Sequence, residues 1–132
     1  NMKSEHKELT QYFSQQTELI KEIHQQLTEH LEQRFTIAEL SKQYLINTST
    51  LKEIFKAVYG QPIATYMKEF RVRQAMKLLR ETNDTIADIA SQVGYQTQGK
   101  FSSAFQSIVK MSPREYRKIQ GIAPSDSFSK TL

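Results

Sequence analysis

Side chains that commonly do acid–base or metal chemistry are few and badly spaced in this sequence. It contains no cysteine, which excludes a disulfide scaffold and a thiolate metal site. His24 and His30 are six positions apart, on different sides of any helix that contains both, and His6 is remote from them. We therefore expect surface histidines, no metal site and no cofactor.

Carboxylate pairs give no better basis for catalysis. Glu29 and Glu32 are three positions apart, and Asp84 and Asp88 are four apart. These are helix-surface spacings, at which solvation explains both charges without a catalytic role. The sequence also has no glycine-rich phosphate-binding loop. We predict that the protein is not an enzyme.

Basic side chains are distributed unevenly along the chain. Residues 1–34 carry four Lys/Arg and six Glu, whereas residues 35–120 carry thirteen Lys/Arg and seven Asp/Glu. A net positive domain attracts polyanions such as DNA phosphates. Because many proteins that bind no nucleic acid are also moderately basic, charge alone leaves the function open.

The basic part of the chain is also an internal repeat. Residues 36–66 read TIAELSKQYLINTSTLKEIFKAVYGQPIATY, and residues 85–116 read TIADIASQVGYQTQGKFSSAFQSIVKMSPREY. Matching positions are 49 apart at the start and 50 apart later, so the second copy carries one extra loop residue. Such a period indicates a duplicated supersecondary unit. Each copy is typical of a helix, a short turn and a second helix, a unit that often binds DNA.

Capping residues and apolar periodicity predict where the helices lie. Helix starts are marked by Thr36 with Glu39, by Thr85 with Asp88, and by Ser112 with Pro113 and Glu115. The expected helices cover residues 17–33, 37–44, 49–59, 63–81, 86–93, 98–109 and 113–119. With about seven helices and no strand signal, the predicted fold is all-α, with two helix-turn-helix subdomains joined by a long linking helix.

Within each repeat, the second helix has one apolar stripe and one free stripe. Leu51 and Phe55 form the apolar stripe of the first copy, and Phe101 and Phe105 that of the second. The opposite stripe is then available for recognition. The linking helix 63–81 would span roughly 28 Å at ~1.5 Å per residue. That length suits two recognition helices in successive major grooves, about one DNA turn (~34 Å) apart.

The turn between the two helices differs between the copies. Gly94 in the second copy suits a left-handed residue at the end of a helix, whereas Leu45 at the matching position does not. We therefore expect the first turn to be the weaker of the two. The helix before Gly94 is expected to bury an apolar face made of Ile86, Ala87, Ile89 and Ala90.

Residues 20–118 resemble the DNA-binding domain of the AraC/XylS family of bacterial transcription regulators. The likeness rests on Ile, Ala, Gly and Tyr at family spacing in residues 86–95, on the Phe-Ser-x-x-Phe run at 101–105, and on Ser-Pro-x-x-Tyr-Arg at 112–117. Residues 71–79 resemble the family's connecting helix, and Lys100 to Phe105 resembles the siderophore-uptake regulators. The resemblance implies a sequence-specific transcription regulator, an activator, in the bacterial cytoplasm and associated with the nucleoid. It implies double-stranded DNA and RNA polymerase as partners.

By position, the family's DNA-contacting residues fall on the free stripe of each second helix. The resemblance implies that Lys52 binds guanine or phosphate, that Glu53 accepts from a cytosine amino group, and that Lys56 reaches phosphate. In the second copy, Thr97 and Lys100 lie nearer the DNA backbone. The expected DNA-binding residues are Thr48, Ser49, Lys52, Glu53, Lys56, Thr97, Gln98, Gly99, Lys100, Ser102, Ser103 and Gln106.

The chain departs from the family pattern at two positions. Lys110 stands where family members usually have glycine, and Ser103 where they often have arginine. Because Ser103 reaches less far, we expect weaker base contact by the second copy, or contact through Gln98 and water. Arg71 is expected in a structural ion pair, and Tyr66, Tyr95 and Tyr116 in the core.

We expect five segments along the chain. They are an N-terminal linker or arm (1–16), a first helix-turn-helix subdomain (17–62), the linking helix (63–81), a second subdomain (82–120) and a disordered tail (121–132). Residues 1–16 could instead form a dimerising helix, or a linker to an effector-sensing domain absent from this chain. The alternative function is a helical protein-interaction module that has lost DNA binding, against which Lys52, Lys56 and Lys100 argue.

Overall fold

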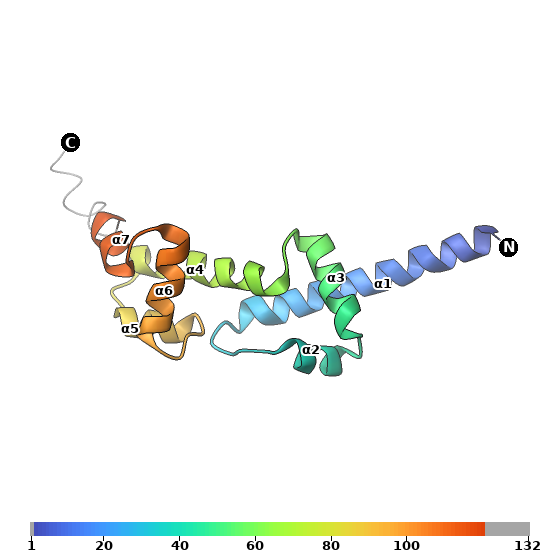
Figure 1. The fold of residues 1–132 in the computed structure, drawn as a ribbon, viewed down its shortest axis with the longest axis horizontal. Helices are drawn as coiled ribbons and strands as arrows, with labels where there is room; N and C mark the ends of the chain where they lie inside the picture. The colour runs from blue at the N-terminus through green and yellow to red at the C-terminus, as the bar shows by residue number, and fades with distance from the viewer. Residues whose placement is uncertain (1, 121–132) are drawn as a thin grey trace. The chain divides into compact units, whose positions relative to one another are not determined.

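The computed structural model describes residues 2–120, and in that range every regular element is a helix (Figure 1). The helices are α1 (Met2–Glu29), α2 (Ile37–Tyr44), α3 (Thr48–Tyr59), α4 (Ile63–Glu81), α5 (Ile86–Gln92), α6 (Gln98–Val109) and α7 (Pro113–Gln120). The predicted all-α fold class is confirmed. The tail 121–132, which we expected to be disordered, lies outside the described residues. None of the described helices has the length and apolar character needed to cross a membrane.

Helix α1 differs most from its prediction. It was expected at residues 17–33, but it begins at Met2 and ends at Glu29. The segment expected as an arm or linker is therefore helical, and its apolar residues Leu9 and Phe13 are exposed. The residues just after α1 leave the helix, and Leu31 among them is buried.

The chain divides into two compact units, each with its own core. Unit 1 contains the chain up to His30 together with Phe35–Met67, and unit 2 contains Leu31–Arg34 together with the chain from Lys68 onward. The boundary lies inside α4, so the first turn of this helix belongs to unit 1 and the rest to unit 2. Unit 1 buries Ile20, Ile23, Leu27, Leu40, Ile46, Leu51, Phe55 and Met67. Unit 2 buries Val72, Ala75, Leu79, Ile89, Ala90, Val93, Phe101, Ala104, Phe105 and Tyr116.

The predicted helix starts are present. The Thr36 hydroxyl accepts from the Glu39 amide at 3.0 Å, and the Glu39 carboxylate accepts from the Thr36 amide at 2.8 Å. Ser112 and Glu115 form the same reciprocal pair at 3.0 and 2.9 Å. The hydrogen bonds with Ser112 lower the pKa of Glu115. Each pair satisfies two backbone N–H donors at a helix start, so local sequence positions the starts of α2 and α7.

The first helix of each repeat ends in the same hydrogen-bonded turn. In both, an amide donates to the carbonyl five residues earlier, at 3.0 Å from Ile46 and at 2.9 Å from Tyr95. The preceding residue is left-handed in each case, with φ of 53° at Leu45 and 93° at Gly94. The two turns thus share this bond and a left-handed residue, although the Leu45 amide donates to the Ser41 carbonyl and the Gly94 amide to the Ser91 carbonyl.

The predicted apolar face of α5 is wrong at one position. Ile89 and Ala90 are buried and Ile86 is half-buried, but Ala87 is exposed. The two alanines lie on different sides of a short helix, so only Ala90 allows close packing within unit 2.

Candidate nucleic-acid interface

Helix α3 in unit 1 has one buried and one exposed side. Leu51 and Phe55 are fully buried. The helix begins at Thr48, one residue before the predicted start, because the Asn47 side chain accepts from the Ser49 amide at 2.8 Å. The opposite side exposes all five predicted residues of this helix, namely Thr48, Ser49, Lys52, Glu53 and Lys56.

Helix α6 in unit 2 has the same arrangement. The Thr97 hydroxyl accepts from the Lys100 amide at 3.1 Å, so this predicted DNA ligand already caps its own helix. Ser102 is half-buried, in a shallow pocket that Ser112 and Pro113 also line. The other predicted residues of this helix, Gln98, Gly99, Lys100, Ser103 and Gln106, are exposed.

Within residues 2–120, the exposed cations of these two helices have no ion-pair partner. In the described part of the chain, ion pairs join Lys21 to Glu18 at 3.5 Å and Arg73 to Glu69 at 3.9 Å, and neither lies on α3 or α6. The ammonium groups of Lys52, Lys56 and Lys100 are therefore not neutralised by a neighbouring carboxylate. Cations of this kind are suited to phosphate.

Arg71 is structural, but its partners are not those expected. Its guanidinium donates to the carbonyl oxygens of Leu31, Val93 (2.8 Å) and Gln33 (3.3 Å), so the predicted ion pair is wrong. Burial, with nearby Arg34, lowers the pKa of Arg71 to about 10. Since the side chain is only 2% exposed, its role is to hold residues 31–34 against the end of α5.

Two tyrosines at matching repeat positions have different partners. The Tyr66 hydroxyl lies 2.8 Å from the His24 ring Nε2, and His24 stacks on Tyr59 at 4.2 Å between ring centres. His24 is half-buried, which corrects its prediction as a surface histidine, and this burial lowers its pKa. The hydroxyl of Tyr116 accepts instead from the Arg80 guanidinium at 2.7 Å. Tyr116 is buried in the core as expected, whereas Tyr66 is only half-buried.

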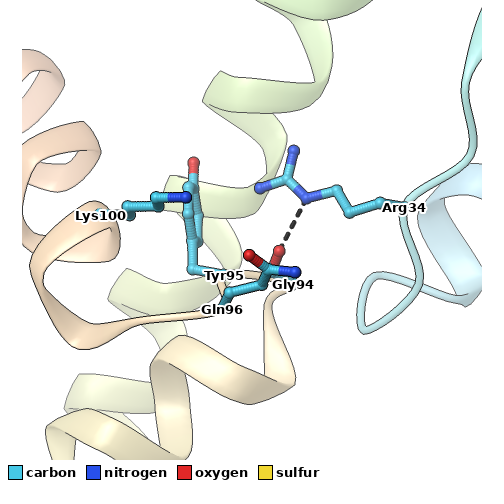
Figure 2. Close-up of a pocket in the computed structure, with 5 residues that line it drawn as sticks. All are labelled: Arg34, Gly94, Tyr95, Gln96 and Lys100. Atoms are coloured by element: carbon cyan, nitrogen blue, oxygen red, sulfur yellow. Dashed lines mark hydrogen bonds between the residues drawn. The ribbon is translucent and has the colours of Figure 1, made fainter.

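One exposed cation beside α6 was missed. Arg34 donates from Nε to the Gly94 carbonyl at 2.7 Å, and its guanidinium carbon lies 4.8 Å from the centre of the Tyr95 ring. With Gln96 and Lys100, these residues line a shallow pocket within unit 2 (Figure 2). No local pattern marks Arg34, because it precedes the repeat and meets residues 60 positions later in the chain.

These features define a protein of two helix-turn-helix units, and comparison with known proteins agrees. Residues 40–119, more than half of the chain, match the family described as "Helix-turn-helix domain", to which the chain therefore belongs. It is an AraC-type member. It is 39% identical over 84 residues to a putative AraC-like transcription regulator of Streptomyces lividans, covering 64% of this chain and 28% of the relative.

A second relative and a solved structure support the same assignment. The transcriptional activator RhaR of Mannheimia succiniciproducens is 34% identical over 91 residues, which cover 69% of this chain and 33% of RhaR. The chain thus spans a third or less of the curated relatives it matches. The DNA-binding domain of AdpA, solved in complex with a target DNA, shares the fold with a TM-score of 0.76 at 20% identity, covering 82% of this chain and 97% of that one. The predicted AraC-type regulator domain is confirmed, and the relatives are named as regulators rather than enzymes.

Proposed function

We propose that this chain is the sequence-specific DNA-binding domain of a transcription regulator, with α3 and α6 as its recognition helices. The observation that carries the proposal is the two-sided character of both helices. Each buries one apolar stripe and exposes the opposite polar stripe, on which the lysines have no carboxylate partner in the described part of the chain. The relatives are named transcription regulators, and the AdpA domain binds DNA with this fold.

The exposed residues suggest a division of roles. On α3, Glu53 can accept from a cytosine amino group, while Lys52 and Lys56 can donate to guanine or to phosphate. On α6, the amides of Gln98 and Gln106 can both donate to and accept from base edges. We infer that base recognition is stronger under α3, whose charged side chains reach further.

We further propose that one chain occupies two successive major grooves of one duplex, because its two units are consecutive in the sequence. We propose RNA polymerase as a protein partner. The proposed location is the bacterial cytoplasm, in association with the nucleoid. We also propose that an effector-sensing domain is part of the same regulator. The narrower likeness to siderophore-uptake regulators, which rests on Lys100 to Phe105, stays a prediction.

Selection of bound duplexes from a random pool, at low and at physiological salt, tests the proposal. We expect enrichment of a site of about two helical turns. Affinity should fall steeply as salt rises, because lysines that bind phosphates release counterions. The double variant Lys52→Gln, Lys56→Gln removes two charges of α3 and keeps side chains of similar length. It should melt as the wild type does and select DNA poorly. Absence of any enriched sequence, with affinity independent of salt, would favour the protein-interaction module instead.

A further inference from the structure

The pocket beside the start of α6 holds two cations and an aromatic ring. In Figure 2, Arg34 and Lys100 approach Tyr95 from opposite sides. Arg34 comes from the segment after α1, which belongs to unit 2, and Lys100 from the first turn of α6. The Arg34 guanidinium lies over the ring of Tyr95, which is favourable because the face of the ring carries negative charge.

The Arg34 guanidinium is held in place while most of its donors remain unused. Its Nε–H donates to the Gly94 carbonyl at 2.7 Å, and its carbon lies 4.8 Å from the ring centre of Tyr95. No hydrogen bond from its two terminal nitrogens is found among the described residues. An arginine fixed in this way presents four N–H donors, and such a planar fork matches two oxygens of a phosphate.

No acidic group in the described residues neutralises these cations. The ion pairs there are Lys21 with Glu18 and Arg73 with Glu69, so no carboxylate lies within 4.0 Å of Arg34 or Lys100. Burial, with nearby Arg34, lowers the pKa of Arg71, so a third positive charge lies near Arg34, and Glu32 is the acid whose field reaches Arg71. The local excess is positive, and an anion is the ligand that relieves it.

We propose that Arg34 and Lys100 together bind one backbone phosphate of the DNA, at the edge of the groove that α6 enters. The inference rests on the proposed function. When the first turns of a recognition helix face base edges, the phosphates that flank the groove lie beside that end of the helix. Arg34 would thus add a contact from outside the repeat and fix the orientation of unit 2 on the duplex, without reading sequence.

Replacing single DNA phosphates by neutral groups tests the proposed contact of Arg34 and Lys100 with one phosphate, which we call the clamp. The selected duplex is prepared with single methylphosphonate substitutions, and affinities are measured by fluorescence anisotropy for wild type, Arg34→Gln, Lys100→Gln and Arg34→Lys. Wild type should lose roughly tenfold at one position beside the half-site of α6, as expected for a charge-assisted hydrogen bond. Arg34→Gln should bind the unmodified duplex about tenfold more weakly for every sequence, and should no longer respond at that position. Arg34→Lys should restore part of the affinity.

The control is Lys21→Gln, which removes an exposed charge of α1 that is paired with Glu18, and its profile should match wild type. If wild type binds a selected duplex but Arg34→Gln keeps the wild-type scan profile, the clamp is wrong while the proposed function stands. If Arg34→Gln lowers the melting temperature and weakens binding while retaining the sensitive position, Arg34 is only structural. If wild type binds no duplex, the proposed function itself fails.

A free anion is the other source of phosphate oxygens. Inorganic phosphate is therefore titrated into the protein alone while the NMR signal of the Arg34 Nε–H is followed. We expect no saturation in the low millimolar range, because one phosphate ion lacks the neighbouring contacts of a duplex. Saturation there, together with an unchanged DNA scan in Arg34→Gln, would assign the pocket to a small anion and overturn the DNA clamp.

Discussion

The two repeats use left-handed backbone at the same two places but put glycine at opposite ones. In unit 1 the turn after α2 has Leu45 (φ 53°) and the end of α3 has Gly60 (φ 84°). In unit 2 the turn after α5 has Gly94 (φ 93°) and the end of α6 has Lys110 (φ 69°). Each unit thus contains one relaxed and one strained helix end.

The hydrogen bonds at these positions explain why the geometry persists when the residue type changes. The Gly60 amide donates to the Lys56 carbonyl at 2.8 Å, and the Lys110 amide donates to the Gln106 carbonyl at 2.9 Å. A side chain at positive φ costs roughly 1 kcal/mol, but a buried helix pair requires a turn of fixed length. The comparison shows that the hydrogen-bonded helix end keeps its left-handed residue even where that residue is Leu45 or Lys110 rather than glycine.

Gly60 and Gly94 have similar backbone angles, but the atoms around them differ. A Cβ atom on Gly94 would overlap the Leu31 carbonyl and the Arg71 guanidinium, whereas nothing lies within 4 Å of a Cβ on Gly60. Gly94 is therefore needed for close packing as well as for φ, and Gly60 for φ alone.

The largest predicted effect follows from that difference. Gly94→Ala should lower the free energy of unfolding by at least ~3 kcal/mol, because it combines overpacking, positive-φ strain and displacement of a buried cation from its carbonyls. Gly60→Ala should cost only about 1 kcal/mol. Urea denaturation of both variants measures the gap. Equal losses in the two variants would mean that the Arg71 cluster yields easily, contrary to the contacts described.

The next effect concerns DNA and should separate α3 from α6. Lys52→Ala or Glu53→Ala should change the preferred bases under α3, at ~1 to 3 kcal/mol for a lost bidentate contact. Ser102→Ala should change little, since Ser102 is half-buried beside Ser112 and Pro113. Selection with the three variants gives base preferences position by position. Preferences concentrated under α6, with Lys52→Ala weakening every sequence equally, would make Lys52 a phosphate anchor and reverse the proposed asymmetry.

Much of the fold followed from local chemistry, and the misplaced end of α1 has a long-range cause. Capping residues and apolar spacing located α2 to α7 within a residue, because both signals act over a few positions. The end of α1 was missed because residues 31–34 pack in unit 2, where Arg71 holds them through carbonyl oxygens. The spacing of apolar residues along a helix cannot indicate a contact with a residue 38 or 40 positions away, as Arg71 is from Gln33 and Leu31.

The sequence predicted correctly which residues of the candidate interface are exposed, except for one, but it left out a residue that lies beside α6. Eleven of the twelve predicted DNA-binding residues are exposed, the exception being Ser102, because a helix with one buried stripe must expose the other. Arg34 was missed since its place beside α6 depends on Gly94 and Tyr95 from a distant part of the chain. Whether these residues contact DNA stays a prediction that the variants above address.

A smaller effect should come from exchanging the strained helix ends for relaxed ones. Leu45 is 90% exposed, so Leu45→Gly loses almost no packing and should stabilise unit 1 by about 1 kcal/mol. Lys110→Gly should gain less, because the Lys110 ammonium donates to the Ser107 carbonyl at 2.8 Å and the variant loses that bond. Thermal melts of the two variants beside Gly60→Ala provide the comparison. A lower melting temperature in Leu45→Gly would show that the exposed leucine contributes more than its strain costs.

The smallest effect should be a difference in pH dependence between the units. Burial lowers the pKa of His24 in the folded protein, so the unfolded chain binds a proton more readily. Stability from neutral His24 is therefore present above its unfolded pKa of about 6.5 and is lost as pH falls below it. Tyr116, the matching tyrosine of unit 2, is hydrogen-bonded to Arg80 rather than to a histidine.

Hydrogen exchange between pH 7 and pH 5 can resolve the two units, with the Phe55 amide reporting on unit 1 and the Phe105 amide on unit 2. After correction for intrinsic exchange rates, protection of Phe55 should fall as pH decreases, while that of Phe105 changes less. His24→Gln keeps a side chain able to hydrogen-bond with Tyr66 but cannot titrate, so it should abolish the difference. If both amides lose protection equally in wild type and variant, carboxylates common to the whole chain control the acid response, and His24 makes no separate contribution.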